Sequence, residues 1–410
     1  MRNRHPELLI PASSLEVLKT AVMFGADAVY IGGEAFGLRA KAKNFSMEDM
    51  KEGVQFAHEH GARVHVTVNI LAHNDDLEGA AEYLKELKEI GPDALIIADP
   101  AIFMLAKEIC PEIERHVSTQ ANNTNYGTFN FWWNLGAKRV VTARELSLKE
   151  IREIRAHIPA EMEIESFIHG AMCISYSGRC LLSNFFTGRD ANQGSCTHPC
   201  RWKYSIVEES RPGEYMPVYE NERGTYIFNS KDLCMIEHMD DILTSGIDSL
   251  KIEGRMRTAL YVATVARTYR KAIDDYLEDP AKYQANMSWY QEQIAGCTYR
   301  KFTTGFFYGK PSEEAQIYDN NTYEKGYTYL GFAEAVDERG YVQITQRNKF
   351  TVGEMIEIMK PDGTNLLVPV KAIYDEEGNS VESAPHPQQK LFVDLGGGAE
   401  VYDILRRSEA

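Results

Sequence analysis

Short apolar segments alternate with amphipathic stretches from about residue 7 to residue 255, and this alternation limits the folds open to the chain. Apolar residues at helical spacing separate eight segments that have the composition of buried strands. The expected strands are Leu8–Ile10, Ala28–Ile31, Val64–Val68, Ala94–Ile97, Glu114–Ser118, Arg139–Thr142, Glu163–Ile168 and Ser249–Ile252. Strands in alternation with helices form a parallel sheet, and eight such units close most naturally into a (β/α)8 barrel of the TIM type.

An open, doubly wound sheet is the alternative architecture. That fold usually carries Gly-x-Gly-x-x-Gly after its first strand, where the glycines bind a dinucleotide. The segment after Ile10 has no such motif. The barrel is therefore the preferred α/β fold.

The pattern changes after Glu253. Residues 258–276 have the spacing of one amphipathic helix, and residues 326–405 alternate in short segments separated by turns such as Pro361–Gly363. Such spacing predicts a small antiparallel β-barrel. We expect a barrel domain at 1–290 with a cysteine-rich insertion at about 170–235, a linker at 291–325 and a β-barrel module at 326–410.

Composition narrows the partners of the chain. Its 410 residues carry a formal net charge of −16, which argues against broad nucleic-acid binding but allows a local patch that docks one structured RNA. Basic and aromatic residues mix at 299–308, which suits either an RNA contact or an aromatic seam between domains. No apolar run has the length of a membrane span and no secretory signal is present, so a cytoplasmic location without membrane association is expected.

Polar residues follow the expected strands, at the end of a barrel where active sites form. They are Gly32, Gly33 and Arg39 after the second strand, Asn69 after the third, Asp99 after the fourth, Gln120, Asn122 and Asn123 after the fifth, Arg144 and Glu145 after the sixth, His169 after the seventh, and Glu253 and Arg255 after the eighth. Arginines bind carboxylates through two parallel hydrogen bonds. This rim predicts a site for a small anionic substrate.

Five of the seven cysteines lie between Cys173 and Cys234. Disulfides are rare in the cytoplasm, so this concentration favours a shared metal. Soft thiolates select zinc or an iron–sulfur cluster, although the Cys-x2-Cys pairs usual for zinc are absent. Cys110 and Cys297 stand apart and are expected to be small buried apolar residues.

Six segments resemble the signature of the peptidase U32 family, also called collagenase-like, over nearly the whole chain. They are Glu165–Cys173, Gly178–Ser183, Gly194–Cys196, Cys200–Trp202, Ser230–Cys234 and Lys251–Arg255. The length and the segment Cys196–Trp202 are most similar to the branch that acts in prephenate-dependent 5-hydroxylation of the tRNA wobble uridine. The resemblance thus implies an iron–sulfur-dependent enzyme that modifies tRNA.

The resemblance also implies roles for individual residues. Related proteins hold a 4Fe–4S cluster on four cysteines, and the matching positions are Cys173, Cys180, Cys196 and Cys234, with Cys200 as an alternative ligand or a neighbour of the cluster. Prephenate, the expected co-substrate, is a dicarboxylate for which Arg39, Arg144 and Arg255 are candidate clamps, with Asn69, Gln120 and Asn122 as further binding residues. Glu165, His169 and Glu253 are the candidate general acids and bases. Each also has a structural alternative: Glu165 supports the cysteine loop, His169 holds backbone, and Glu253 pairs with Lys251 or Arg255.

Two other functions stay open. A U32-type peptidase would need a reactive cysteine and histidine, such as Cys196 with His198 or Cys173 with His169. The chain lacks the His-Glu-x-x-His and Gly-x-Ser-x-Gly motifs of other hydrolases. A non-catalytic iron–sulfur scaffold would instead serve a paralogue or partner hydroxylase.

Overall fold

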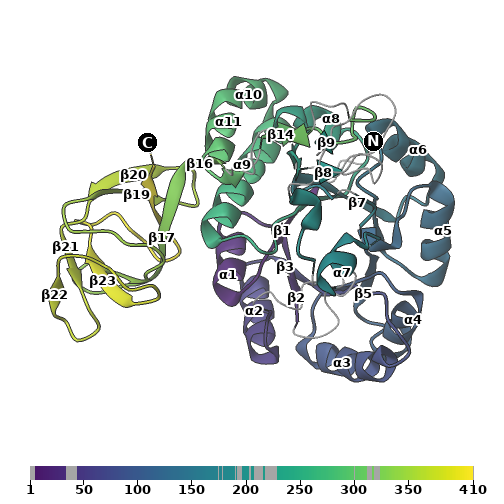
Figure 1. Cartoon of the computed structure of the whole chain (residues 1–410), viewed down its shortest axis with the longest axis horizontal. Helices are drawn as coiled ribbons and strands as arrows, with labels where there is room; N and C mark the ends of the chain where they lie inside the picture. Colours follow the sequence, from purple (N-terminus) through teal and green to yellow (C-terminus); the bar gives the residue numbers. More distant parts are fainter. Residues whose placement is uncertain are drawn as a thin grey trace.

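The computed structural model divides the chain into a barrel and a smaller β-sheet module beside it (Figure 1). It describes residues 5–33, 44–173, 175–177, 179–189, 191, 196–202, 205–206, 216–217, 229–299, 301–311, 316–317 and 324–409. Arg39 therefore lies outside the described residues. No helix in these ranges is long and apolar enough to cross a membrane.

Eight parallel strands form the barrel wall. They are β1 (Glu7–Pro11), β2 (Ala28–Gly32), β3 (Arg63–Val68), β4 (Ala94–Ile97), β5 (Glu114–Val117), β6 (Arg139–Val141), β7 (Glu163–Gly170) and β12 (Ser249–Ile252). Neighbours in this order pair in parallel, and β12 pairs with both β1 and β7, which closes the ring. All eight expected strands are present, so the predicted closed barrel is confirmed and the open sheet is excluded.

Helices surround this wall (Figure 1). The outer helices are α1 (Leu15–Met23), α2 (Met47–Glu59), α3 (Asp76–Ile90), α4 (Pro100–Ile109), α5 (Tyr126–Leu135), α6 (Leu148–His157), α8 (Met239–Leu243) and α9 (Ala259–Glu278), followed by α10 (Pro280–Ala285) and α11 (Met287–Ala295). Side-chain caps define several starts: Asp99 accepts from two backbone N–H groups of α4, and Ser147 forms a reciprocal capping box with Glu150 on α6. Such caps satisfy N–H groups that have no partner within the helix.

The chain between β7 and β12 carries the clustered cysteines. Its described elements are α7 (Leu182–Thr187), the short 3-10 helices η2 (Pro199–Arg201) and η3 (Ile236–His238), and the strands β8 (Ser205–Ile206), β9 (Met216–Pro217), β10 (Asn229–Ser230) and β11 (Asp232–Cys234). Strand β11 runs antiparallel to β7 and places Cys234 opposite His169. Strand β14 (Phe302–Thr303) then pairs with β11. The segment thus returns to the barrel strand from which it departs.

The C-terminal module is a curled antiparallel sheet, as expected from its turns. Its strands are β17 (Tyr327–Val336), β18 (Val342–Thr345), β19 (Met355–Met359), β20 (Asn365–Pro369), β21 (Ala372–Tyr374), β22 (Ser380–Val381), β23 (Lys390–Asp394) and β24 (Ile404–Ser408). Short strands precede it at β13 (Thr298–Tyr299), β15 (Gln316–Ile317) and β16 (Glu324–Lys325). The module contacts the barrel where the Tyr329 hydroxyl donates to Glu16 at 2.7 Å and Arg267 donates to the Lys360 carbonyl at 2.9 Å.

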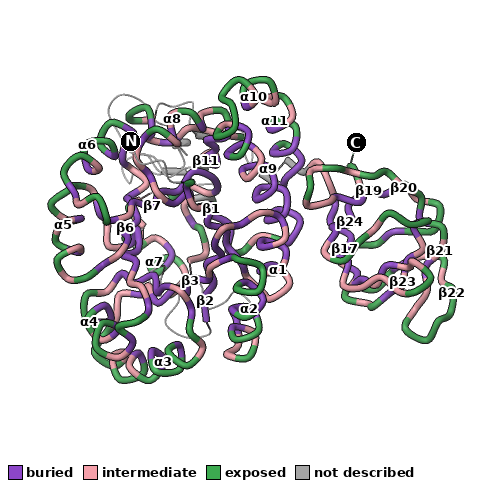
Figure 2. The backbone as a smooth tube through the Cα atoms, turned by 180° about the vertical axis from the view of Figure 1, so that it is seen from behind, coloured by how far each residue is buried: buried purple, intermediate pink, exposed green. Residues whose placement is uncertain are grey.

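Strand alternation separates the main core from the barrel interior. Leu8 and Ile10 of β1 belong to the apolar layer between wall and helices, which Figure 2 shows as buried backbone around the barrel. The intervening Leu9 instead joins a small apolar cluster with Ala28, Tyr30 and Ile96. The rest of the interior is markedly polar, because His65, His116 and Glu165 are fully buried there.

Arg139 is the centre of this polar interior and is 2% exposed. Its guanidinium pairs with Glu7 of β1 and with Glu163 and Glu165 of β7, the latter two at 2.8 and 3.1 Å. Burial by itself would raise the pKa of Glu7, but the charge and hydrogen bonds of Arg139, together with the nearby His65 and Arg63, hold that pKa far below its usual value. The barrel base therefore depends on charges that compensate one another.

We predict that Arg139→Met lowers the free energy of unfolding by about 3–5 kcal/mol, since it leaves buried carboxylates without their cation. Urea unfolding followed by circular dichroism measures the loss. Arg339→Met is the matched control: this arginine is 60% exposed and forms an ion pair with Asp337, two residues away. Its unfolding midpoint should equal that of the wild type. Equal midpoints for both variants would contradict the role given to Arg139.

Candidate active site at the barrel mouth

A cavity of about 100 Å³ opens where the barrel strands end. Its lining comes from β2 to β7 and from β12, at the face where (β/α)8 enzymes place their active sites. The lining residues are Tyr30, Thr67, Asn69, Ile96, Ser118, Thr119, Gln120, Arg144, Phe167, Ser177, Lys251, Glu253 and Arg255. Most of these residues are polar, and Tyr30, Ile96 and Phe167 add apolar surface; convergent polar groups in a concave site are typical of ligand binding.

The charges of this lining favour an anion. Arg144, Lys251 and Arg255 are cationic and Glu253 is the carboxylate among them, which leaves a formal excess of two positive charges. The whole chain has a net charge of −16, so this cavity opposes its surroundings. Positive charge in a walled site attracts anionic ligands. A small dianion is the ligand that the lining suits best.

Arg255 is fixed by contacts with strand β3 and with Asn44, which precedes α2. It donates to the Thr67 hydroxyl at 3.1 Å and to the Asn44 side-chain oxygen at 2.9 Å. A Cβ atom at position 32 would lie 2.0 Å from the Arg255 Nη2 atom. Gly32 has no Cβ atom and therefore leaves room for the Arg255 guanidinium at the cavity.

Arg144 links the cavity wall to the cysteine segment. Its Nη1 atom donates to the Ala171 carbonyl at 2.9 Å, and its guanidinium carbon lies 4.1 Å from the centroid of the Phe167 ring. The ring face attracts the cation and restricts its position. Arg144 can thus contact a ligand and support the chain that leads to Cys173.

Lys251 also lines the cavity, although the sequence suggested it only as a partner of Glu253. It is 4% exposed, and its Nζ atom lies 2.6 Å from a Glu165 oxygen and 4.4 Å from the Tyr30 ring centroid. Burial lowers the pKa of Lys251, and Glu165 opposes this shift. The sequence contained a signal for this position, because side chains alternate between the two faces of β12. The neighbours Leu250 and Ile252 belong to the apolar layer between wall and helices, so Lys251 faces the barrel interior.

The structure gathers five of the predicted rim residues at this cavity. Asn69, Gln120, Arg144, Glu253 and Arg255 all line it. The predicted binding residue Asn122 lies at its edge with a φ of 55°, where it donates to the Ser177 carbonyl at 3.4 Å and accepts from Arg179 at 2.7 Å.

Glu165 and His169 lie outside the cavity lining. Both oxygens of Glu165 are engaged, one by Lys251 at 2.6 Å and one by Arg139 at 3.1 Å. His169 is 2% exposed, with its Nδ1 atom 3.3 Å from the Tyr269 hydroxyl oxygen. Burial, followed by the charge of Arg257, lowers the pKa of His169 to about 3. Of the three predicted acid–base residues, Glu253 is the one that the structure brings to the cavity.

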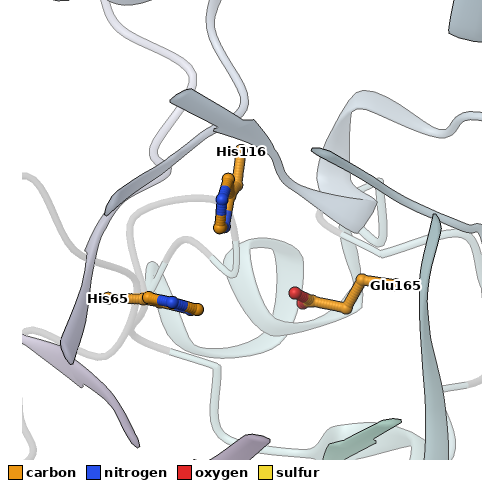
Figure 3. A group of neighbouring side chains, drawn as sticks. All are labelled: His65, His116 and Glu165. Atoms are coloured by element: carbon orange, nitrogen blue, oxygen red, sulfur yellow. The ribbon is translucent and has the colours of Figure 1, made fainter. Parts of the chain in front are cut away.

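His65, His116 and Glu165 meet inside the barrel, with one potential ligand atom from each within 4.8 Å of the others (Figure 3). The His116 Nε2 atom lies 3.1 Å from a Glu114 oxygen. Burial lowers the pKa values of both histidines well below the usual value. A divalent ion here would stand beside Lys251 and Arg139, which already hold Glu165, so the group fits a buried polar network better than a metal centre.

The clustered thiols occupy different environments near the end of β7. Cys173 is exposed, Cys180, Cys196 and Cys200 are half-buried, and Cys234 is buried on β11. Burial raises the pKa of Cys234 to about 12, and the Tyr269 hydroxyl oxygen lies 3.8 Å from its sulfur. Metal binding would have to displace this proton.

The donor chemistry fits an iron–sulfur cluster. In the described part of the chain, no three thiols come within the 4.8 Å expected of ligands to one ion. The cysteines of a 4Fe–4S cluster each bind a different iron and therefore stand farther apart. The soft sulfur donors suit such a cluster, and the choice among the five thiols stays a prediction.

Comparisons with known proteins match this chain to one family. The model described as peptidase family U32 matches residues 13–317, and that of the peptidase family U32 C-terminal domain matches residues 325–406. The chain is 43% identical over 407 residues to tRNA hydroxylation protein P1 of Bacillus subtilis (strain 168), covering 99% of this chain and 96% of the relative. It is 38% identical over 449 residues to tRNA hydroxylation protein P of Escherichia coli (strain K12), covering 98% and 97%. A solved U32 peptidase structure matches 62% of this chain and 95% of its own, with 16% identity and a TM-score of 0.41.

We predict that Cys110 and Cys297 resist alkylation in the folded, metal-depleted protein. Both are buried, and burial raises their pKa values to about 11 and about 12, so little thiolate forms at pH 8. Iodoacetamide labelling with peptide mass spectrometry should modify the exposed Cys173 first. Unfolding in guanidinium should remove the difference. Equal labelling rates in the folded protein would contradict the burial of these two residues.

Proposed function

Because the chain belongs to peptidase family U32, we propose that it is an iron–sulfur-dependent enzyme that hydroxylates tRNA, at C5 of the wobble uridine. The observation that carries the proposal is the cationic cavity at the barrel mouth, adjacent to the cysteine segment. The near-complete coverage of relatives named tRNA hydroxylation proteins supports the reaction class. A cavity lined from seven strands, with polar residues from most of them, favours an enzyme over a non-catalytic scaffold.

Prephenate or a derivative is the proposed co-substrate. It carries two carboxylates, which matches the formal excess of two positive charges in the cavity lining. Arg255, fixed by Thr67 and Asn44, and Arg144, fixed over Phe167, would each receive one carboxylate. Asn69 and Gln120 add hydrogen-bonding groups. Arg39, the third predicted clamp, lies outside the described residues.

Glu253 is the proposed general acid–base, because its side chain lines the cavity. Lys251, which forms an ion pair with Glu165, lines the same cavity, so negative charge that develops there would be balanced by Lys251. His169, held neutral by its burial, would act through hydrogen bonds beside Cys234.

Cys173, Cys180, Cys196 and Cys234 would hold the 4Fe–4S cluster, with Cys200 as an alternative ligand. A bound cluster would supply one-electron transfer and an electrophilic iron. The residues of this chain bind and orient the substrates beside it. Peptidase activity is disfavoured for the thiol opposite His169, because the raised pKa of Cys234 makes it a poor nucleophile.

We predict that a strain lacking this gene, and lacking any oxygen-dependent counterpart, loses 5-hydroxyuridine derivatives from its tRNA. The wild type and Cys110→Ala should restore them, whereas Cys180→Ala should not and should bind less iron after anaerobic purification. Mass spectrometry of tRNA nucleosides measures the product. Cys110 is the matched control because it is a buried thiol at the end of α4, outside the cysteine segment.

Unchanged tRNA nucleosides in the deletion strain would contradict the proposed substrate and direct attention to ribosomal RNA or to peptides. Restoration by Cys180→Ala would contradict its role as a ligand. Restoration only when a paralogue is also supplied would identify a scaffold in place of an enzyme.

We also predict that Arg255→Lys weakens prephenate binding about tenfold, because lysine keeps the charge but loses the two-pronged hydrogen bond. Calorimetric titration of the anaerobic protein measures the dissociation constant. Arg152→Lys on α6 is the control, since Arg152 is 45% exposed and pairs with Asp241 away from the cavity. Equal affinity for both variants would contradict the carboxylate clamp.

A further inference from the structure

The cysteine segment exposes an unusual amount of apolar surface. Tyr176, Leu181, Phe185, Phe186 and Trp202 are all exposed, and the values for Leu181 and Phe185 are 74% and 81%. Large apolar side chains gathered on a surface usually mark a binding site. No described element covers these residues, so their exposure calls for a partner.

Three of these rings form one surface, here called the aromatic platform: Phe185 and Phe186 on α7, and Trp202 after η2. The centroids of Phe185 and Phe186 are 5.1 Å apart, and those of Phe186 and Trp202 are 6.2 Å apart. Two parts of the segment that are distant in sequence therefore bring their rings together.

Hydrogen bonds beneath the aromatic platform hold these two parts in place. The Thr197 backbone N–H donates to the buried Ser183 hydroxyl at 3.0 Å, and the hydroxyl oxygens of Ser183 and Thr197 lie 3.1 Å apart. The rings are thus presented by a fixed scaffold, and little conformational freedom would be lost on binding.

The local charge identifies the chemistry of the partner. Residues 171–203 contain Arg179, Arg189, Arg201 and Lys203 against one acid, Asp190. This positive excess stands in a chain with a net charge of −16. Exposed aromatic rings on a segment whose sequence has an excess of positive charge suit a single-stranded nucleic acid, whose bases stack and whose phosphates attract cations.

The aromatic platform also follows directly from the cavity. Ser177 lines the cavity, and Arg179 bonds to Asn122 at its edge before α7 begins. In Figure 1, α7 lies within the ring of outer helices, over the barrel strands. A strand of RNA on the aromatic platform would therefore lie beside the cavity opening.

We propose that the aromatic platform stacks the RNA bases that flank the base entering the cavity. This inference rests on the proposed function. Chemistry on a base requires its removal from the stack, and its neighbours then lose a stacking partner. Phe185 and Trp202 replace that partner, and they do so for any base because every base has an aromatic face. The predicted basic and aromatic stretch at 299–308 is less suited, because Phe307 is buried and Phe302 packs 5.8 Å from the His169 ring.

Binding of unmodified tRNA, purified from the deletion strain, tests the proposal. Filter binding at one fixed salt concentration, without co-substrate, should show that Phe185→Ala and Trp202→Ala each weaken affinity roughly tenfold. Phe131→Ala is the matched control, since Phe131 is a 54% exposed ring on the outer helix α5. Thermal unfolding of Phe185→Ala should match the wild type, because the side chain is 81% exposed.

Three results would overturn the proposal. The first is equal tRNA affinity for the wild type, Phe185→Ala and Trp202→Ala. The second is a wild type that binds no tRNA although the deletion strain lacks 5-hydroxyuridine, which leaves the proposed function intact. The third is a dimeric wild type that becomes monomeric in Phe185→Ala, which would assign the platform to contact between copies of the chain. Sedimentation analysis of the same samples measures the oligomeric state and so tests this third result.

Discussion

The ion pairs of Arg139 are the interaction on which the rest of the barrel depends. One guanidinium joins Glu7 on the first strand to Glu163 and Glu165 on the seventh, so it ties together parts of the wall that are far apart in sequence. A cation buried to 2% exposure requires this compensation. Its third partner, Glu165, also binds Lys251, and Lys251 lines the cavity. A connected set of ion pairs therefore joins the charges of the candidate site to those of the barrel interior.

This arrangement explains how an anion could bind in a strongly acidic protein. Lys251 is buried and its pKa is lowered by that burial, so Glu165 is needed to keep its charge in place. Arg144 and Arg255 complete the cationic wall from two other loops, each fixed by a separate contact. Attraction is thus confined to this opening and to the positively charged cysteine segment beside it, while the negative net charge of the chain disfavours general binding of polyanions.

Much of the fold could be predicted because the alternation of apolar strands with amphipathic helices is a local signal. All eight barrel strands lay where the apolar segments indicated, and five of the predicted rim residues line one cavity. Glu165 and His169 were harder to place, since position along a strand does not tell whether a side chain reaches the mouth or stays beneath it. Lys251 could have been found from alternation. The pairing of Phe186 with Trp202 could not, because it depends on the path of a long segment between two short elements.

The antiparallel pairing of β11 with β7 has a consequence for how such proteins diversify. Gly170 and Leu233 are neighbours across this pairing, so residues 171–231 leave and rejoin the barrel at one point. The entropy of closing a loop rises only with the logarithm of its length, by about 0.6 kcal/mol for each doubling. Residues can therefore be added to or removed from this excursion without disturbing the closed wall. A lineage could reshape what surrounds the thiols while it inherits the cations of the cavity, Arg144, Lys251 and Arg255, from outside this excursion.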